Sequence, residues 1–318
     1  MSAAGTPAFT SIQDHVSRLG DTDFWWPYVA EILDRHGLRD PASGPGPGRK
    51  LTAGTNGTYP TFLYGDLVVK LFGYSRAWRE SHTAERAAQT LIATDPEIAA
   101  PRLLGEGRLY EDDSAPWPYL ITTRMPGIPW REAELSRAQQ IVVAADLGRQ
   151  VHRVHALRPS AGSAPNPTRE AVTAAAEQSS LPPHLTAQVD TYLAQLGPYD
   201  PAFVHGDLTA QHVFVENGRL TGIIDWGDAT VTDRHYEIGQ LHRALFNCDK
   251  TLLRAFLEAA EWPASGDFPR QCLGLALHRQ AAGIAQHHSF DLFEPIAALF
   301  PLQDLATLDA LAAELFAV

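Results

Sequence analysis

Apolar and polar residues alternate along several short segments in the first third of the chain, and this alternation predicts β-strands. Gly65-Asp66 separates two of these segments and is typical of a hairpin turn. Pro60 has no backbone N–H to donate, so we expect the first segment at a sheet edge. The predicted strands are residues 59–64, 67–72, 103–110 and 119–123.

Apolar residues that recur every three or four positions predict helices in other parts of the chain. Val143, Leu147 and Val151 show this spacing and define one face of a helix. Pro182 is expected to interrupt a later helix. The other predicted helices are residues 24–36, 77–94, 167–196 and most of the chain after residue 235.

Short strands return between the helices of the second half. Asn217-Gly218 is a strong signal for a two-residue hairpin turn. The strands predicted here are residues 202–204, 213–215 and 220–224. The pattern therefore predicts a small lobe with a mixed sheet, residues 1–123, and a larger, mainly helical lobe, residues 124–318.

The composition is that of a globular protein, because 45% of the 318 residues are hydrophobic and 19% are charged. The net charge of −12 is expected to repel nucleic acid and anionic membranes and to attract a cationic ligand, although solubility alone also explains it. Two cysteines are too few for a disulfide scaffold, which favours a reducing compartment. The first residues do not resemble a signal peptide, and no apolar stretch approaches the roughly 18 residues of a membrane span. We therefore expect a soluble, cytoplasmic protein.

Two acidic residues follow short predicted strands in the second half of the chain. Asp207 ends the sequence His205-Gly206-Asp207, and Asp225 comes directly after the predicted strand 220–224. A hairpin between them can bring both carboxylates to a common point. One can then accept a proton from a hydroxyl group while the other holds a divalent metal, as phosphoryl transfer requires.

These motifs resemble the aminoglycoside phosphotransferase family, which shares the protein-kinase fold. The most specific matches are His-Gly-Asp-Leu at 205–208 and Ile-Ile-Asp-Trp at 223–226, and the resemblance extends from about Tyr59 to the helices after Tyr236. The resemblance implies an α+β, two-lobed, protein-kinase-like fold and transfer of a nucleotide γ-phosphate to a hydroxyl group. Within the family the chain looks most like hygromycin phosphotransferases, through residues 69–73, 116–120, 130–131 and 203–207.

The resemblance assigns roles to four residues of this chain. Asp207 matches the catalytic base, and Asp225 matches the carboxylate that binds magnesium at the nucleotide phosphates. Lys70 matches the strand lysine that contacts the α- and β-phosphates, which accounts for a charge within an apolar strand. Glu85 in the following helix is its expected ion-pair partner, with Glu80 as the competitor.

The chain departs from the kinase pattern at His212, where asparagine is expected five residues after the base. Macrolide phosphotransferases are similar to the chain at this position, because they also carry histidine. A neutral imidazole can bind a divalent ion, although magnesium prefers oxygen ligands. We predict that His212 is a metal ligand, with a packed or loop-fixing histidine as the alternative, whereas His205 is expected to be structural.

The resemblance also implies a nucleotide, ATP or GTP, bound with Mg²⁺. The loop at residues 53–58 can offer backbone N–H groups to phosphates, although a plain turn explains it equally well. Residues 119–127 resemble the family's inter-lobe hinge, where the backbone pairs with the adenine edge. Besides Lys70 and Glu85, the candidate nucleotide-binding residues are Thr55, Asn56 and Gly57 in the loop and Thr123 and Met125 in the hinge.

The acceptor is predicted from charge and resemblance alone. Asp228 and Glu237 are predicted to contact it, and the resemblance places a loop-holding carboxylate near Asp233, although solvated surfaces also explain such acids. The predicted activity is phosphorylation of a hydroxyl group on a small molecule. The negative charge favours a cationic antibiotic of the aminoglycoside or hygromycin type, and a macrolide or a metabolic sugar or alcohol is the alternative.

Two other classes of protein stay open at this point. A nucleotide-binding module without catalytic activity accounts for His212, but it does not explain why Lys70, Asp207 and Asp225 are all present. A metallohydrolase can use these aspartates with His205 and His212 as ligands, but it has no use for Lys70.

Overall fold

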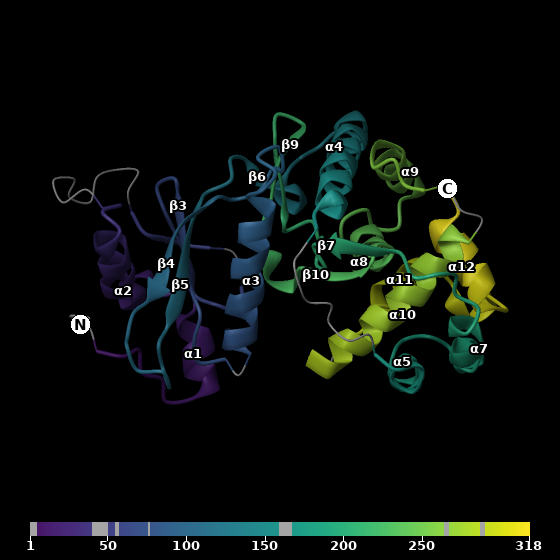
Figure 1. The fold of residues 1–318 in the computed structure, drawn as a ribbon. Helices are drawn as coiled ribbons and strands as arrows, with labels where there is room; N and C mark the ends of the chain where they lie inside the picture. The colour runs from purple at the N-terminus through teal and green to yellow at the C-terminus, as the bar shows by residue number, and fades with distance from the viewer. Residues whose placement is uncertain are drawn as a thin grey trace. The chain divides into compact units, whose positions relative to one another are not determined.

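The computed structural model describes residues 5–39, 50–54, 57–75, 77–158, 167–263, 267–286 and 290–318 (Figure 1). The chain divides into two compact units. The first unit comprises residues 1–94 and 100–125, and the second comprises residues 95–99 and 126–318.

An antiparallel sheet with the strand order β1-β2-β3-β5-β4 forms the centre of the first unit. The hairpin prediction at Gly65 is confirmed, because this residue adopts a φ of 59° between two paired strands. The edge position inferred from Pro60 is wrong: β1 pairs with β2 on the side away from β3, and Pro60 lies just before the strand. The strands are β1 (Thr52–Ala53), β2 (Thr61–Tyr64), β3 (Leu67–Leu71), β4 (Leu103–Arg108) and β5 (Pro118–Thr123).

The helix α2 (Thr22–Arg35) supplies much of the core of this unit. It begins where the Asp21 carboxylate accepts a hydrogen bond from the Phe24 N–H at 3.0 Å, which satisfies one of the free donors at a helix start. Trp25 is fully buried in one cluster with Phe62 of β2 and Ile121 of β5. The apolar stripe of α2 therefore packs against the sheet.

Two more helices belong to this unit, α1 (Ile12–Arg18) and α3 (Trp78–Ile92). The sequence pattern predicts α3 with slightly wider bounds. It does not predict α1, because Ile12 and Val16 are 53% and 57% exposed and form no buried stripe.

The second unit contains two small antiparallel sheets, β6-β8-β9 and β10-β7. The predicted hairpin at Asn217-Gly218 is confirmed: both residues have positive φ angles, 52° and 73°, between β8 and β9. The sequence pattern does not predict β10, which pairs with β7 and completes the second sheet. The strands are β6 (Ile128–Pro129), β7 (Pro201–Val204), β8 (Val213–Glu216), β9 (Arg219–Ile223) and β10 (Thr230–Asp233).

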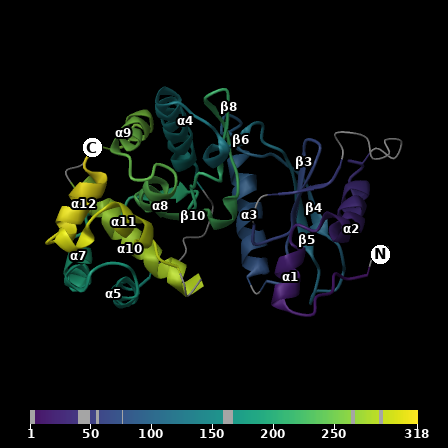
Figure 2. The ribbon, with the colours of Figure 1, turned by 180° about the vertical axis from the view of Figure 1, so that it is seen from behind.

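Helices make up most of the second unit. The predicted helix over residues 167–196 is divided into three, and Pro183 occupies the first position of the middle one. α4 runs alongside α9 in both views of the ribbon (Figures 1 and 2). The helices are α4 (Arg137–Ala156), α5 (Arg169–Glu177), α6 (Pro183–Thr186), α7 (Val189–Leu193), α8 (Tyr236–Ala244), α9 (Lys250–Ala259), α10 (Phe268–Gln286), α11 (Glu294–Leu299) and α12 (Leu308–Phe316).

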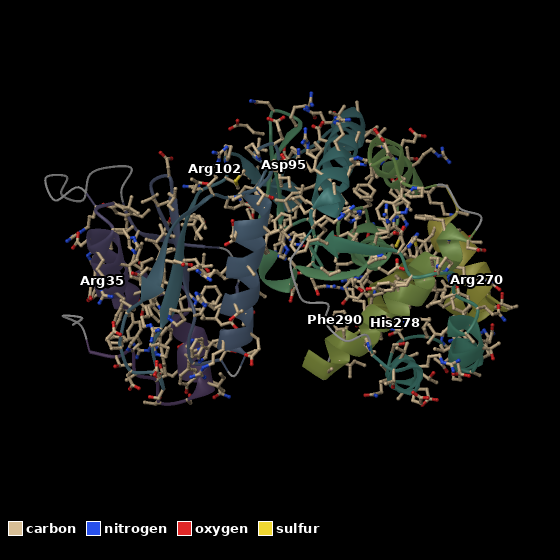
Figure 3. The ribbon with its side chains drawn as sticks, viewed as in Figure 1. Arg35, Asp95, Arg102, Arg270, His278 and Phe290 are labelled. Atoms are coloured by element: carbon tan, nitrogen blue, oxygen red, sulfur yellow. The ribbon has the colours of Figure 1, made fainter. Side chains whose placement is uncertain are left out.

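The helix α10 packs against α5, α8 and α12. Arg270 near its start pairs with Asp309 of α12 at 2.9 Å and is labelled in Figure 3. Among the described residues, no helix is long and apolar enough to span a membrane.

Candidate active site

The predicted catalytic loop begins where β7 ends at Val204. Gly206 in this loop has a φ of 82°, and a Cβ atom there would lie 2.4 Å from the backbone oxygen of Asp228. Only glycine fits such an approach. The His-Gly-Asp sequence therefore contains glycine because the loop passes directly over the segment that follows β9.

His205 fixes the conformation of this loop. Its Nε2 donates to the Ile224 carbonyl at 2.9 Å, and its Nδ1 accepts from the backbone N–H of Asp207 at 3.1 Å. Burial and the nearby His212 lower the pKa of His205 to about 4, so the ring is neutral at pH 7. This is the set of contacts that a structural histidine makes.

Glu237 holds the same loop through hydrogen bonds to the loop backbone. The prediction that Glu237 contacts the substrate is wrong. The side chain is buried, with the residue 1% exposed, so no acceptor can reach its carboxyl group. Its two oxygens accept hydrogen bonds from the backbone N–H groups of His205, at 2.8 Å, and Gly206, at 3.3 Å. Burial raises the pKa of Glu237 to about 7, against the opposing effect of these hydrogen bonds and of Arg279.

Asp233 has a different role from the one that the resemblance implies. Its carboxylate accepts from the backbone N–H groups of Asp200 and His235, at 3.0 and 2.9 Å, and from the His235 ring at 2.7 Å. These contacts tie the end of β10 to the start of α8. Glu237, rather than Asp233, is the carboxylate that contacts the catalytic loop directly.

The Asp207 side chain lies at the surface of this loop, with 24% of it exposed. Its Oδ1 accepts hydrogen bonds from Gln240 at 2.8 Å and from Arg279 at 3.0 Å. Neither donor was found from the sequence. Gln240 and Arg279 lie on helices far along the chain, and no local motif marks them.

His212 and Asp225 form a pair of donors suited to one divalent cation. His212 donates from Nδ1 to the Asp207 carbonyl at 2.7 Å, which leaves the lone pair of Nε2 on the opposite side of the ring. That nitrogen lies 3.7 Å from Asp225 Oδ2. Asp225 adopts left-handed backbone angles, φ 63° and ψ 70°, which are strained for a residue other than glycine.

The pair fits a magnesium ion that is bound together with a phosphate ligand. Among the described residues, no group of three His, Cys, Asp or Glu side chains is arranged to hold a metal. Mg²⁺ is usually held by one or two protein ligands, waters and substrate phosphates, so two donors meet this requirement. Asp228, the next predicted acid, is exposed. Loss of water around its carboxyl group, and then the negative charge of Asp207, raise its pKa.

In the first unit, Lys70 and Glu85 form the expected ion pair. The Lys70 ammonium lies 2.6 Å from the Glu85 carboxylate, and the two side chains are 16% and 9% exposed. The ammonium also lies 5.5 Å from the centre of the Phe72 ring. β3 places Lys70 between β2 and β5, opposite Thr61 and Leu120.

The remaining nucleotide candidates lie in loops of this unit. Thr55 and Asn56 are outside the described residues, and Gly57 is exposed. Thr123 exchanges two hydrogen bonds with the backbone of Arg102, both of 2.9 Å. Met125 follows the end of β5 and is half-buried.

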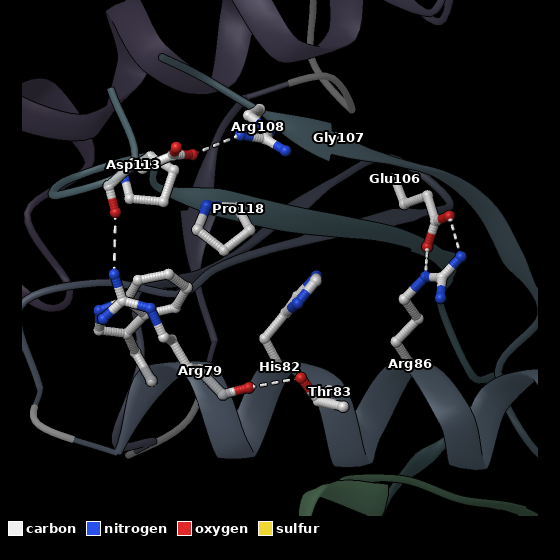
Figure 4. A pocket seen from close by; sticks show the side chains of 11 residues that line it. Arg79, His82, Thr83, Arg86, Glu106, Gly107, Arg108, Asp113 and Pro118 are labelled. Carbon is white, nitrogen blue, oxygen red and sulfur yellow. Dashed lines mark hydrogen bonds and ion pairs between the residues drawn. The ribbon is translucent and has the colours of Figure 1, made fainter. Parts of the chain in front are cut away.

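A cavity of about 610 Å³ lies along α3, facing β4 and β5 (Figure 4). His82 projects into it between Arg79 and Arg86. The arginines that line it already have partners within its wall: Arg86 pairs with Glu106, and Arg79 donates to the Asp113 carbonyl. Among the described residues that line the cavity, none is a predicted site residue.

Comparison with solved structures shows the same fold at low sequence identity. A GDP complex of wild-type aminoglycoside 2'-phosphotransferase-IIIa matches 91% of this chain and 98% of its own, with 20% identity and a TM-score of 0.65. The macrolide 2'-phosphotransferase MphH from Brachybacterium faecium, an apoenzyme, matches 91% and 97%, with 20% identity and a TM-score of 0.53. The aminoglycoside phosphotransferase APH(3'')-Id from Streptomyces rimosus, in complex with ADP and streptomycin, matches 81% and 98%, with 16% identity and a TM-score of 0.53.

The predicted α+β, kinase-like fold is therefore confirmed. In addition, the model of the phosphotransferase enzyme family matches residues 57–270, which is more than half of the chain. The chain belongs to the phosphotransferase enzyme family, as an enzyme that transfers phosphoryl groups to hydroxyl groups.

Proposed function

We propose that the protein transfers the γ-phosphoryl group of ATP or GTP to a hydroxyl group of an antibiotic. The observation that carries this proposal is the partly exposed carboxylate of Asp207 beside the His212–Asp225 pair. Family membership supports it. So do fold neighbours that were solved with GDP or ADP.

In this reaction Asp207 accepts the proton of the acceptor hydroxyl while the hydroxyl oxygen bonds to the γ-phosphorus. The bond from that phosphorus to the bridging oxygen breaks, and the nucleoside diphosphate leaves. Asp225 and His212 would hold Mg²⁺, which would neutralise phosphate charge when bound. Lys70, oriented by Glu85, binds the nucleotide phosphates.

We assign nucleotide binding to residues 1–123 and catalysis and acceptor binding to residues 124–318. The backbone of the hinge, at Thr123 and Met125, is the proposed contact for the base. The loop that contains Gly57 is the proposed contact for the phosphates.

An aminoglycoside is the acceptor that the charge favours. The chain has a net charge of −12, and Asp228 is exposed beside the Asp207 loop. Such a surface attracts a polycation. Solved neighbours include complexes with kanamycin and with streptomycin.

A macrolide is the second candidate, and His212 is the observation that favours it. Macrolide phosphotransferases carry histidine at the corresponding place, and one of the fold neighbours is a macrolide 2'-phosphotransferase. A macrolide has one amine and a large apolar surface, so apolar burial rather than charge would dominate its binding.

The experiment is a transfer screen of the purified protein with kanamycin, streptomycin, erythromycin and glucose, each with ATP and with GTP. The KM of the best acceptor is then measured at increasing salt, with the nucleotide KM as control. An aminoglycoside acceptor should show a KM that rises clearly with salt, because surface attraction is screened over about 8 Å at physiological ionic strength. A KM that does not change with salt contradicts the aminoglycoside assignment, and failure to phosphorylate any acceptor contradicts the proposed function.

A further inference from the structure

Two hydrogen-bond donors converge on one oxygen of the Asp207 carboxylate. Gln240 on α8 and Arg279 on α10 both donate to Oδ1, at 2.8 and 3.0 Å. The second oxygen, Oδ2, instead faces His212, whose Nδ1 is 3.5 Å away and already donates to the Asp207 carbonyl. The two carboxylate oxygens are therefore not equivalent.

The orientation of Gln240 follows from its other neighbour. Arg243 donates to Gln240 Oε1 at 2.7 Å. Because a guanidinium can only donate, the amide oxygen must face Arg243, and the amide N–H₂ group then points to Asp207. Gln240 and Arg243 lie three residues apart on one face of α8, which lets one helix present both side chains together.

Arg279 holds the loop by two atoms rather than one. One Nη nitrogen donates to the backbone carbonyl of Gly206 and the other to Asp207 Oδ1. The guanidinium also lies over the Tyr236 ring, 5.4 Å from its centre, and only 11% of the side chain is exposed. Rotation of the Asp207 carboxylate would break a charge-assisted bond to a donor that is itself fixed to the backbone.

We infer that Arg279 is a positioning residue for Asp207, and that Oδ2 is the oxygen that accepts the proton of the acceptor hydroxyl. This inference rests on the proposed function. A carboxylate oxygen has about two acceptor sites, and both sites of Oδ1 are used by Gln240 and Arg279. Oδ2 keeps its capacity for the substrate. Arg279 lies outside residues 57–270, the part of the chain that the family model matches.

The test compares Arg279→Met, Arg279→Lys and the control Arg270→Met. Arg270 lies on the same helix and pairs with an Asp309 side chain that is 54% exposed, so its loss should have little effect. Rates are measured with the acceptor that the parent uses best among kanamycin, streptomycin, erythromycin and glucose. Melting temperatures are measured for every variant. Asp207 is partly exposed, so Arg279→Met does not leave a fully buried charge.

Arg279→Met is expected to lower kcat about 100-fold, because loss of alignment at a reacting group has this size of effect. The KM values for acceptor and nucleotide should stay within about threefold. Arg279→Lys keeps one charged donor nitrogen, so its kcat should be about tenfold higher than that of Arg279→Met. The kcat of Arg270→Met should match that of the parent within about twofold. A kcat of Arg279→Met within twofold of the parent, or a change in KM alone, overturns the inference.

A double variant separates this inference from the proposed function. In an Asp207→Asn background, Arg279→Met should cause no further loss of rate, because Arg279 acts through Asp207. A further loss of tenfold or more contradicts the positioning role. If Asp207→Asn alone keeps the parent kcat, or if the parent phosphorylates none of the four acceptors, the proposed function itself fails and the inference fails with it.

Discussion

Replacement of Glu237 by glutamine should destabilise the folded protein at low pH and stabilise it at high pH. The ordinary pKa of the carboxyl group is 4.5, and burial raises it to about 7 in the folded protein. The folded state therefore holds the proton more tightly than the unfolded state. The stability that Glu237 contributes is fully present below about pH 4.5 and is lost as the pH rises through about 7.

The size of this effect follows from the two pKa values. One pKa unit corresponds to about 1.4 kcal/mol, so ionisation of Glu237 costs the folded state about 3 kcal/mol above pH 8. Glutamine cannot ionise and avoids this cost. Its N–H₂ group cannot accept from the Gly206 N–H, however, which costs about 1–2 kcal/mol at every pH. We expect Glu237→Gln to be less stable than the parent by up to about 1 kcal/mol at pH 5, where part of the ionisation cost is already present, and more stable by about 1–2 kcal/mol at pH 8.

The assay is urea denaturation of both proteins at pH 5, 6, 7 and 8. Buried histidines change the stability of both proteins in the opposite direction: burial lowers the pKa of His242 to about 4, so its contribution is lost as the pH falls. The difference between parent and variant removes this shared effect. Glu258→Gln, on the exposed side of α9, is the control for the same substitution at a surface position. A difference for Glu237→Gln that is constant with pH would refute the reasoning.

Substitutions at three further positions test separate parts of the site. Gly206→Ala should lower the melting temperature and abolish transfer. In the control Gly37→Ala, φ is 65° but the added Cβ atom meets no other part of the chain within 4 Å, so only the backbone strain of about 1–2 kcal/mol is expected. Equal losses of stability in the two variants would contradict the steric argument. Glu85→Gln removes the negative charge that pairs with Lys70 and should lower the free energy of unfolding and raise the nucleotide KM. An unchanged KM in steady-state assays would contradict the role of the pair. His212→Asn should keep substantial activity with Mg²⁺, whereas His212→Ala should need a higher Mg²⁺ concentration for activity. If His212→Ala and the parent need the same Mg²⁺ concentration, His212 has a packing role instead.

The parts of the site that could be predicted are formed by residues that lie close together along the chain. The strand-loop-hairpin order brings Asp207, His212 and Asp225 together within one connected segment, so spacing alone indicates that they lie close. Lys70 is recognisable because a charge in an apolar strand needs a partner, and the following helix offers Glu85. These contacts depend on local structure that the sequence pattern predicts well.

The residues that were missed or misassigned depend on packing between distant elements. Arg279 reaches Asp207 only because α10 packs against α8, and nothing in the sequence around Arg279 distinguishes it from a surface arginine. The prediction that Glu237 contacts the acceptor rests on its negative charge and its place after Asp225, and neither distinguishes a buried carboxylate from an exposed one. Glu237 is buried because α8 packs against the catalytic loop. The periodicity of a single helix does not predict which element it packs against.

The central claim is tested most directly by radiolabel transfer from γ-labelled ATP or GTP with the parent and with Asp207→Asn. The account predicts that the parent labels a hydroxyl acceptor, and that Asp207→Asn loses about 1000-fold in rate while its nucleotide affinity changes less than about twofold. Transfer by Asp207→Asn at the rate of the parent would contradict it.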